Sequence, residues 1–147
     1  NNNVGYFNSK GLGSTLMLGT DGMHSDMQQR MKSAYFVGQN FDPMSPMQAY
    51  NRLRNAHRYL SSNNFSGDDE SNLLVIDYNS PTPVTPDNFA AHLVFGINSS
   101  HIRDVISNGK LIVKNHRLTQ VDEEALMGES RKMATYLWKR MGGAAAS

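Results

Sequence analysis

Cysteine is absent from this 147-residue sequence, so disulfide bonds and thiolate metal ligands are both excluded. No apolar run approaches the roughly 18 residues that a membrane-spanning helix needs. Charged residues make up only 18% of the chain, and its 14 basic and 13 acidic residues are mixed without long runs. These shortages argue against nucleic-acid and membrane partners, and the missing cysteines fit a cytoplasmic location.

The sequence begins Asn1-Asn2-Asn3, without an initiator Met and without the charged and apolar segments of a signal peptide. We therefore expect it to belong to a longer protein. Nine methionines are many for this length. Because the flexible thioether fills irregular gaps, most of them are expected in the core.

The first half of the chain changes from a strand pattern to a helical one. Thr15–Leu18 is a short apolar run that predicts a buried strand, and Gly19–Gly22 ends it in a tight turn. Asp26 is placed to cap a helix that continues to about Gly38. Ser45 and Pro46 open a second helix. A lone strand before two helices cannot form a sheet, so its partner strands are expected elsewhere.

The second half has mainly strand patterns. Leu73–Tyr78 predicts a strand, and Asp87–Phe95 predicts a short helix or strand. Ile102–Ser107 and Leu111–Lys114 flank Asn108-Gly109, the strongest two-residue hairpin signal in the chain.

A long helix is predicted from its capping residue Asp122 to about Arg140, with an apolar stripe along it. The stripe consists of Leu126, Met127, Met133, Ala134, Leu137 and Trp138. The polar, acidic loop near residues 61–71 divides the chain into a first region at 1–65 and a second at 66–141, and a disordered tail is expected at 142–147.

The best candidate for chemistry is the turn Gly19–Gly22. Its Asp21 follows a predicted buried strand, and barrel enzymes place catalytic groups at such carboxyl ends. The glycines allow a sharp turn and leave room for a ligand beside the carboxylate. Taken alone, a Gly-x-Asp-Gly sequence is usually only a turn. The simplest interpretation of the next residues gives Ser25 or Asp26 the helix cap and leaves His24 in solvent.

The other ionisable residues form no recognisable metal motif, because the sequence has neither a His-x-His nor a His-Glu-x-x-His spacing. His57 is expected to be packed or exposed on its helix. The other three histidines, His92, His101 and His116, are each expected to make a structural hydrogen bond. The acidic run at 68–70 lacks the alternating oxygen ligands of a calcium loop and is expected to be solvated. A free-standing metalloenzyme built on Asp21 and His24 would have too few ligands.

The order of motifs resembles the amidohydrolase superfamily. Residues 18–23, Leu-Gly-Thr-Asp-Gly-Met, precede Ser-Asp-Met at 25–27. This pattern is similar to the eighth-strand region of the branch containing atrazine chlorohydrolase, cytosine deaminase and guanine deaminase. Residues 74–83, Leu-Val-Ile-Asp-Tyr-Asn-Ser-Pro-Thr-Pro, resemble aminohydrolases of the SsnA type more specifically. The segments at 92–96, 108–110 and 121–124 extend the resemblance, which covers roughly Asn2 to Met141.

The resemblance implies an α/β fold in which this chain is the C-terminal fragment of a (β/α)8 metal-dependent hydrolase barrel. Residues 1–65 would hold the last barrel strand and its helices. Residues 66–141 would form part of a small β-sandwich with a terminal helix. Three histidine-bearing strands would precede Asn1, so the expected partners are the missing N-terminal part of the same protein and a small-molecule substrate. The oligomeric state is left open, and a homo-oligomer is one alternative.

Asp21 matches the aspartate that such enzymes use as a metal ligand. The resemblance implies one divalent ion, zinc or iron, which lowers the pKa of bound water and makes hydroxide available. Asp21 would accept the proton of that water and return it to the leaving group. The substrate would be a small heterocycle attacked at a carbon–nitrogen or carbon–halide bond. Deamination, dechlorination and amide hydrolysis stay open, and this chain alone would be inactive.

The sequence departs from the family pattern in two places. Ser66–Asn72 replaces the usual Gly-x-Leu-x-x-Gly-x-x-Ala-Asp stretch, and a sandwich strand is lost with it. Asn1–Ser14 is short of the helix that usually precedes strand eight. The alternative to an enzyme is therefore a non-catalytic interaction module or a diverged remnant of the same fold. A partner or a second copy would then cover the exposed strand edges.

Overall fold

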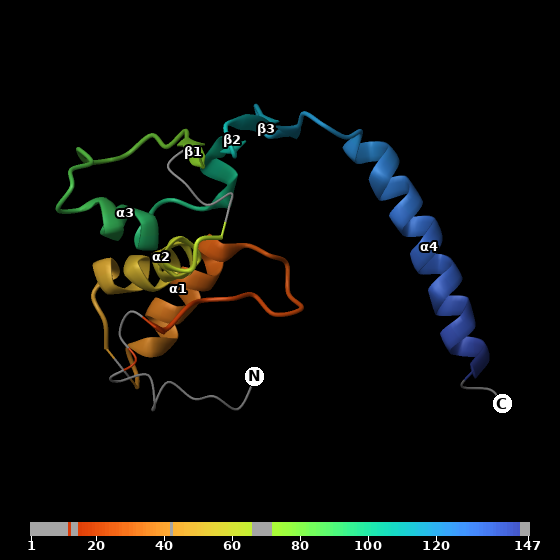
Figure 1. The fold of residues 1–147 in the computed structure, drawn as a ribbon, viewed down its shortest axis with the longest axis horizontal. Coiled ribbons are helices and arrows are strands. Elements are labelled where there is room, and N and C mark those ends of the chain that lie inside the picture. The colour runs from red at the N-terminus through yellow and green to blue at the C-terminus, as the bar shows by residue number, and fades with distance from the viewer. Residues whose placement is uncertain (1–11, 13–14, 42, 66–71, 145–147) are drawn as a thin grey trace.

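The computed structural model describes residues 12, 15–41, 43–65 and 72–144. In chain order the elements are α1 (Met27–Gly38), α2 (Pro46–Ser62), β1 (Leu73–Ile76), α3 (Phe89–Phe95), the 3-10 turn η3 (Ser99–His101), β2 (Ile102–Ser107), β3 (Lys110–Lys114), β4 (Arg117–Leu118) and α4 (Glu123–Ala144). Figure 1 shows a small sheet, a group formed by α1, α2 and α3 below it, and α4 standing apart. The described chain is thus a mixed helix and strand structure with a small antiparallel sheet.

Capping explains where α1 and α2 begin. The Oδ1 atom of Asp26 accepts a hydrogen bond from the Gln29 backbone N–H, 2.9 Å away, and so satisfies a donor that the first turn of α1 leaves unpaired. Ser45 and Gln48 form a reciprocal capping box, and Pro46 occupies the first position of α2. Both predicted helix starts are confirmed.

The sheet has four antiparallel strands in the order β1-β2-β3-β4. Asn108 and Gly109 join β2 to β3 with φ angles of 49° and 71°, the pair of positive values that a two-residue type I′ turn requires. The predicted hairpin is therefore confirmed. A second turn with two positive φ angles, at Asn115 and His116, joins β3 to β4 and was not predicted.

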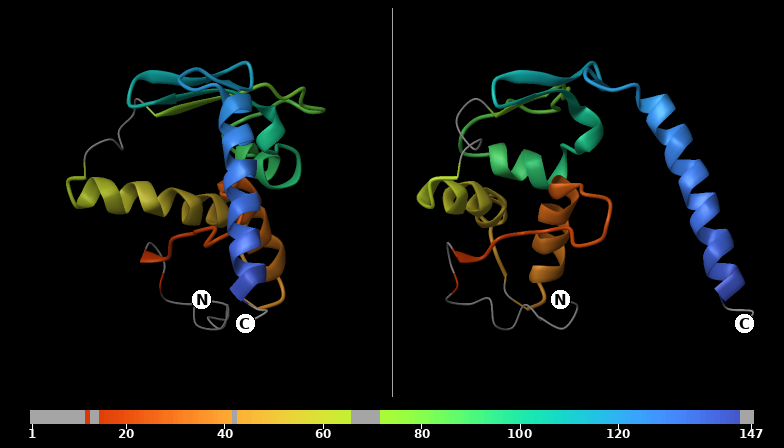
Figure 2. Two further views of the ribbon diagram at one scale, coloured as in Figure 1. Left: turned by 90° about the vertical axis from the view of Figure 1, so that its right-hand side faces the viewer. Right: turned by 45° about the vertical axis from the view of Figure 1, so that its right-hand side comes forward.

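The hydrophobic core lies among the first three helices. Its buried members are Met31, Met44, Ala49, Leu93, Val94 and Ile97. The views of Figure 2 place the sheet over α3, with α1 and α2 beneath it. The core therefore joins residues from both sides of the predicted boundary between 65 and 66. The boundary segment itself, 66–71, lies outside the described residues, so the division into two regions stays a prediction.

The strand predicted at Thr15–Leu18 is not formed. Thr15 lies in a 3-10 turn, and residues 16–20 have no regular secondary structure. A strand needs a neighbour for its backbone hydrogen bonds, and the described part of the chain provides none here. Burial nevertheless alternates, because Leu16 and Leu18 are half-buried while Met17 is exposed. One side of this segment packs on the helices and the other side is uncovered.

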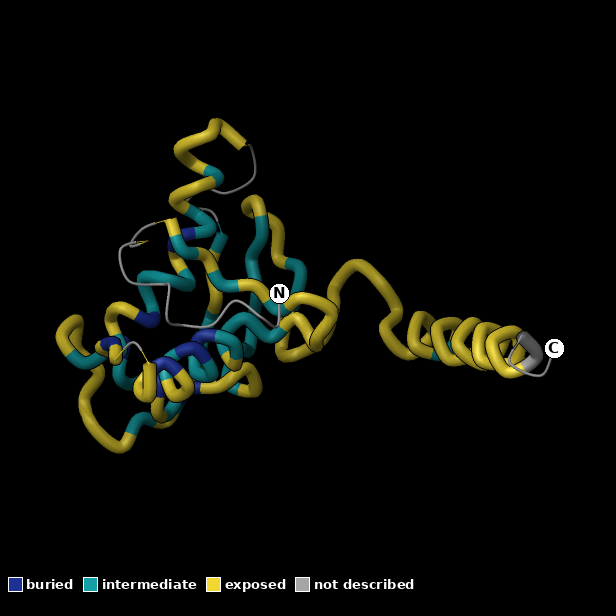
Figure 3. Tube along the Cα trace, turned by 90° about the horizontal axis from the view of Figure 1, so that it is seen from below, coloured by how far each residue is buried: buried dark blue, intermediate teal, exposed yellow. Residues whose placement is uncertain are grey.

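Helix α4 is almost entirely exposed. It continues to Ala144, beyond its predicted end near Arg140, and Figure 3 shows its residues exposed along nearly the whole length. Among the described residues, no helix combines the length and the apolar character needed to cross a bilayer.

The methionines do not follow the expected distribution. Met31 and Met44 are buried, but the exposed methionines are Met17, Met23, Met47, Met127, Met133 and Met141. The expectation that most of them fill the core is wrong. Three of the exposed ones belong to α4, which stands away from the other elements (Figure 1).

Candidate functional site

Asp21 lies in a tight, exposed turn between residues 16–20 and α1. The Met23 backbone N–H donates to the Thr20 carbonyl at 3.2 Å and closes the turn. Asp21 has a φ of 53°, in the left-handed region that aspartate tolerates better than most residues because its short side chain can bond locally. Its Oδ1 atom accepts a hydrogen bond from the Gly22 N–H at 2.9 Å. No described residue binds Oδ2, which is therefore open to a ligand.

Helices α1 and α2 hold this turn in place. Asn55 of α2 is only 3% exposed and donates from Nδ2 to the Leu16 carbonyl, 2.8 Å away. Arg30 of α1 donates to the Thr20 carbonyl at 3.4 Å. These two bonds fix the backbone that leads into Asp21. Sequence reasoning missed both side chains. Asn55 lies on the polar side of α2, away from Ala49, Leu53 and Leu60, so the helical pattern gave no signal for its burial.

His24 and Ser25 form the short connection from the turn to α1. Ser25 has a φ of 58°, also in the left-handed region. The Nδ1 atom of His24 accepts a hydrogen bond from the Asp26 backbone N–H at 3.3 Å. Because this bond uses the Nδ1 lone pair, only Nε2 of His24 is left for another partner. The predicted cap at Asp26 and the predicted exposure of His24 are both confirmed.

Asp26 also links this region to the sheet side of the molecule. Its Oδ2 atom accepts a hydrogen bond at 2.6 Å from the Ser99 hydroxyl, 73 positions along the chain. Partial burial opposes ionisation of Asp26. The hydrogen bonds from Ser99 and from the backbones of Gln29 and Gln28, with the nearby His24, outweigh that effect, so the pKa of Asp26 lies below its ordinary value. No sequence signal pointed to Ser99.

The described ranges contain no group of three or more histidine, aspartate and glutamate side chains that could hold a metal ion. Asp21 offers one carboxylate, a suitable ligand for zinc or iron, whereas catalytic zinc is typically held by three protein ligands. The described residues thus provide one plausible ligand and do not complete a metal site. The acidic run at 68–70 lies outside the described residues.

The histidines outside the turn have varied surroundings. The Nδ1 atom of His101 accepts a hydrogen bond from the Asn98 backbone N–H at 3.0 Å and helps to cap η3, which confirms its predicted structural role. His57 is half-buried on α2. His116 is exposed in the turn between β3 and β4, with a φ of 63°.

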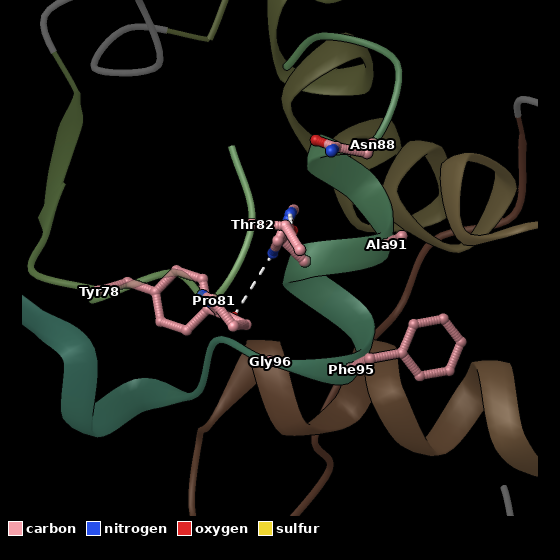
Figure 4. A pocket seen from close by; sticks show the side chains of 8 residues that line it. Tyr78, Pro81, Thr82, Asn88, Ala91, Phe95 and Gly96 are labelled. Carbon is pink, nitrogen blue, oxygen red and sulfur yellow. Dashed lines mark hydrogen bonds between the residues drawn. The ribbon is translucent and has the colours of Figure 1, made fainter. Parts of the chain in front are cut away.

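His92 lines a cavity of about 420 Å³ between α3 and the loop after β1. Its Nδ1 lies 3.4 Å from the hydroxyls of Tyr78 and Ser80, and its Nε2 lies 3.3 Å from the Thr82 hydroxyl. The lining residues, drawn in Figure 4, are Tyr78, Pro81, Thr82, Asn88, Ala91, His92, Phe95 and Gly96. His92 therefore has the predicted structural role. Its contacts with the hydroxyls of Tyr78, Ser80 and Thr82 connect α3 to the loop after β1. Asp21 does not line this cavity.

The chain is similar over most of its length to hydrolytic deaminases of the amidohydrolase type. More particularly, the relatives are named 5-methylthioadenosine/S-adenosylhomocysteine deaminase. The protein from Pelotomaculum thermopropionicum is 28% identical over 141 residues, which cover 87% of this chain and 32% of the relative. The one from Desulforamulus reducens is 28% identical over 144 residues, covering 86% and 32%. A third, from Dictyoglomus thermophilum, is 32% identical over 71 residues, covering 48% and 17%.

The chain spans about a third of the length of the relatives that match most of it. No protein-family model matches the chain. The predicted resemblance to amidohydrolase-type deaminases is confirmed at this level, and the finer resemblance to the SsnA type stays a prediction.

Proposed function

We propose that this chain is part of an amidohydrolase-type deaminase that hydrolyses a carbon–nitrogen bond of a small aminated heterocycle. The observation that carries the proposal is the 28% identity to a 5-methylthioadenosine/S-adenosylhomocysteine deaminase over 141 residues. Because the relatives' names specify thioether derivatives of adenosine, that substrate class is the first to test. Deamination therefore takes precedence over dechlorination and amide hydrolysis.

In this proposal Asp21 is both a metal ligand and a proton carrier. Its Oδ1 atom is held by the Gly22 N–H, while Oδ2 has no partner in the described chain. This arrangement supports both roles, since one oxygen keeps the carboxylate oriented and the other is free to bind or to take a proton. A bound divalent ion, zinc or iron, would lower the pKa of a water molecule beside it. Asp21 would take a proton from the reacting centre and deliver it to the departing amine.

The remaining metal ligands would come from an N-terminal part of the same protein. Residues 1–65 would then complete a (β/α)8 barrel, and residues 66–141 would belong to a small β-sandwich with its terminal helix. Residues 16–20 support this assignment, because they form no strand in the described chain although Leu16 and Leu18 are half-buried. A neighbouring barrel strand would satisfy the backbone groups that Asn55 and Arg30 leave without a partner. The SsnA-type motif at 74–83 and a cytoplasmic location belong to the same proposal.

Metal content tests the proposed role of Asp21 before any substrate is known. We expect the complete protein to purify with about one zinc or iron per chain and Asp21→Asn to lose most of it. Asp87→Asn is the matched control, because Asp87 is an exposed aspartate outside the turn. Equal metal content in all three proteins would show that Asp21 is not a metal ligand. The isolated 147-residue chain is expected to bind zinc weakly and to release no ammonia from 5′-methylthioadenosine.

The second candidate is a non-catalytic interaction module. Exposed apolar side chains on β1 and α4 favour it, for example Leu73 at 53% exposure and Trp138 at 66%. A complete protein that carries no metal and releases no ammonia from any adenosine thioether, yet binds a protein partner, would support this candidate over the deaminase.

A further inference from the structure

Helix α4 carries an apolar face, interrupted by Ser130, that nothing in the described chain covers. At 100° per residue, one side of the helix collects Leu126, Met127, Met133, Ala134, Leu137, Trp138 and Met141. The large side chains among them are 49–66% exposed. Figures 1 and 2 show that α4 leaves the sheet through an extended connection and runs away from the helical group.

An isolated helix of this kind needs a partner. At 1.5 Å per residue, the 22 residues of α4 span about 33 Å. Helices of this length gain most of their stability from packing of an apolar face rather than from intrinsic propensity. An exposed apolar face between Leu126 and Met141 is also the kind of surface that marks an interaction site.

The charges of α4 indicate which partner fits. The N-terminal half, 123–130, carries Glu123, Glu124 and Glu129, and the C-terminal half, 131–144, carries Arg131, Lys132, Lys139 and Arg140. One half is therefore purely acidic and the other purely basic. Two copies of α4 packed antiparallel would set each acidic half against a basic half, whereas a parallel pair would set like charges together.

One register satisfies the apolar face and the charges together. With a two-fold axis between Ala134 and Thr135, nearly the full length of the two helices overlaps. Met133 then lies beside Leu137 of the second copy, at the centre of the contact. Glu129 lies opposite Arg140 of the second copy, and the symmetry repeats this pair once.

We propose that α4 is a dimerisation helix whose apolar face packs antiparallel against α4 of a second copy of this chain. Sedimentation equilibrium of the 147-residue chain tests the proposal. We expect a dimer in the micromolar range, and Leu137→Glu should weaken it at least tenfold. Thr135→Glu places the same charge on the opposite face of the helix and should leave the dimer intact. A wild-type chain that stays monomeric at 100 µM while α4 remains helical overturns the proposal.

The sequence offers two direct reporters of this contact. Trp138 is the only tryptophan, so its emission should shift to shorter wavelength as the dimer forms. Because the chain has no cysteine, single cysteines can map the orientation. A mixture of Glu129→Cys and Arg140→Cys should form the 129–140 disulfide under mild oxidation. In the proposed register, the two 129 positions lie about 16 Å apart along the axis and should not cross-link. Dominant 129–129 cross-links would overturn the antiparallel arrangement.

Charge exchange separates pairing between two helices from the pairing of Glu129 with Lys132 inside one helix. Glu129→Arg should weaken the dimer, and the double variant Glu129→Arg/Arg140→Glu should restore it. If Glu129 acted only inside its own helix, where Lys132 lies 2.7 Å from its carboxylate, the double variant would recover no dimer stability. Failure of the double variant to recover, with helicity preserved, would contradict the proposed register.

Discussion

The helical group α1–α3 and the single helix α4 contain similar residues in opposite situations. Met31 in α1 is fully buried, whereas Met133 in α4 is 63% exposed. The buried members of the core come from α1, α2, α3 and the residues next to them, and none comes from the part of α4 whose burial is described. An apolar pattern at helical spacing therefore predicts which face is to be covered, and it does not predict whether the covering surface lies in the same chain.

The largest difference between the two regions is expected for a matched pair of methionine substitutions. Met31→Ala should lower the free energy of unfolding by about 2–5 kcal/mol, because it leaves a cavity in the core. Met133→Ala should change it by about 0.5 kcal/mol or less, provided that the chain is monomeric at the concentration used. Urea denaturation of both variants makes the measurement. Equal losses would mean that α4 packs on the helical group in solution.

A smaller effect is expected at the support of the Asp21 turn. Asn55→Ala removes the hydrogen bond to the Leu16 carbonyl and should cost about 1–3 kcal/mol, since a partly buried carbonyl loses its partner. Hydrogen exchange in residues 16–23 should also become faster. Asn40→Ala, at an exposed position beyond α1, is the control and should change neither quantity. Unchanged exchange near Asp21 in Asn55→Ala would show that α2 does not hold the turn.

Replacing a glycine by alanine should lower stability in the helical group and raise it in α4. A Cβ atom at Gly96 would collide with the Tyr78 hydroxyl, so Gly96→Ala should destabilise the helical group by about 1–3 kcal/mol. A Cβ atom at Gly128 of α4 meets nothing within 4 Å. Gly128→Ala should therefore raise the helicity of α4, by up to about 1 kcal/mol of helix stability. Circular dichroism and thermal unfolding distinguish the two outcomes, and destabilisation by Gly128→Ala would mean that something covers that side of α4.

The smallest expected effect is a pH dependence of the free energy of unfolding, caused by Asp26 at the start of α1. Asp26 has a lower pKa in the folded chain than its ordinary value of 3.8. Its ionised form therefore stabilises the fold above that ordinary value, and the contribution is lost as the pH falls through the folded value. Asp26→Asn should flatten this part of the stability profile, and Ser99→Ala should raise the pKa of Asp26 in an NMR titration. If Ser99→Ala leaves the titration of the Asp26 carboxyl unchanged, the hydrogen bond from Ser99 to Asp26 is not formed in solution.

Local signals in the sequence were sufficient for the helix starts and the hairpin. Asp26, the Ser45–Pro46 pair and the Asn108–Gly109 pair each act through backbone groups a few residues away, so their effect can be predicted without the fold. The turn at Asn115 and His116 was missed because it lacks the glycine that usually marks two positive φ angles.

Contacts between distant parts of the chain could not be predicted. The hydrogen bond from Ser99 to Asp26 joins residues 73 positions apart, and no pattern in either segment indicates it. The prediction of a strand at Thr15–Leu18 was wrong for a related reason, because strand formation depends on a neighbouring strand and not on the apolar run alone. For the candidate site, the position of Asp21 in a turn was predictable, while its supports, Asn55 and Arg30, became visible only in three dimensions.

The proposed role of Asp21 depends above all on the turnover of the complete protein. Hydrolytic deamination of 5′-methylthioadenosine or S-adenosylhomocysteine should be measured for wild type, Asp21→Asn and the control Asp87→Asn. We expect Asp21→Asn to lower kcat at least about a hundredfold, because a proton carrier is lost, while Asp87→Asn keeps wild-type turnover. Wild-type turnover in a folded Asp21→Asn protein would show that Asp21 takes no part in catalysis.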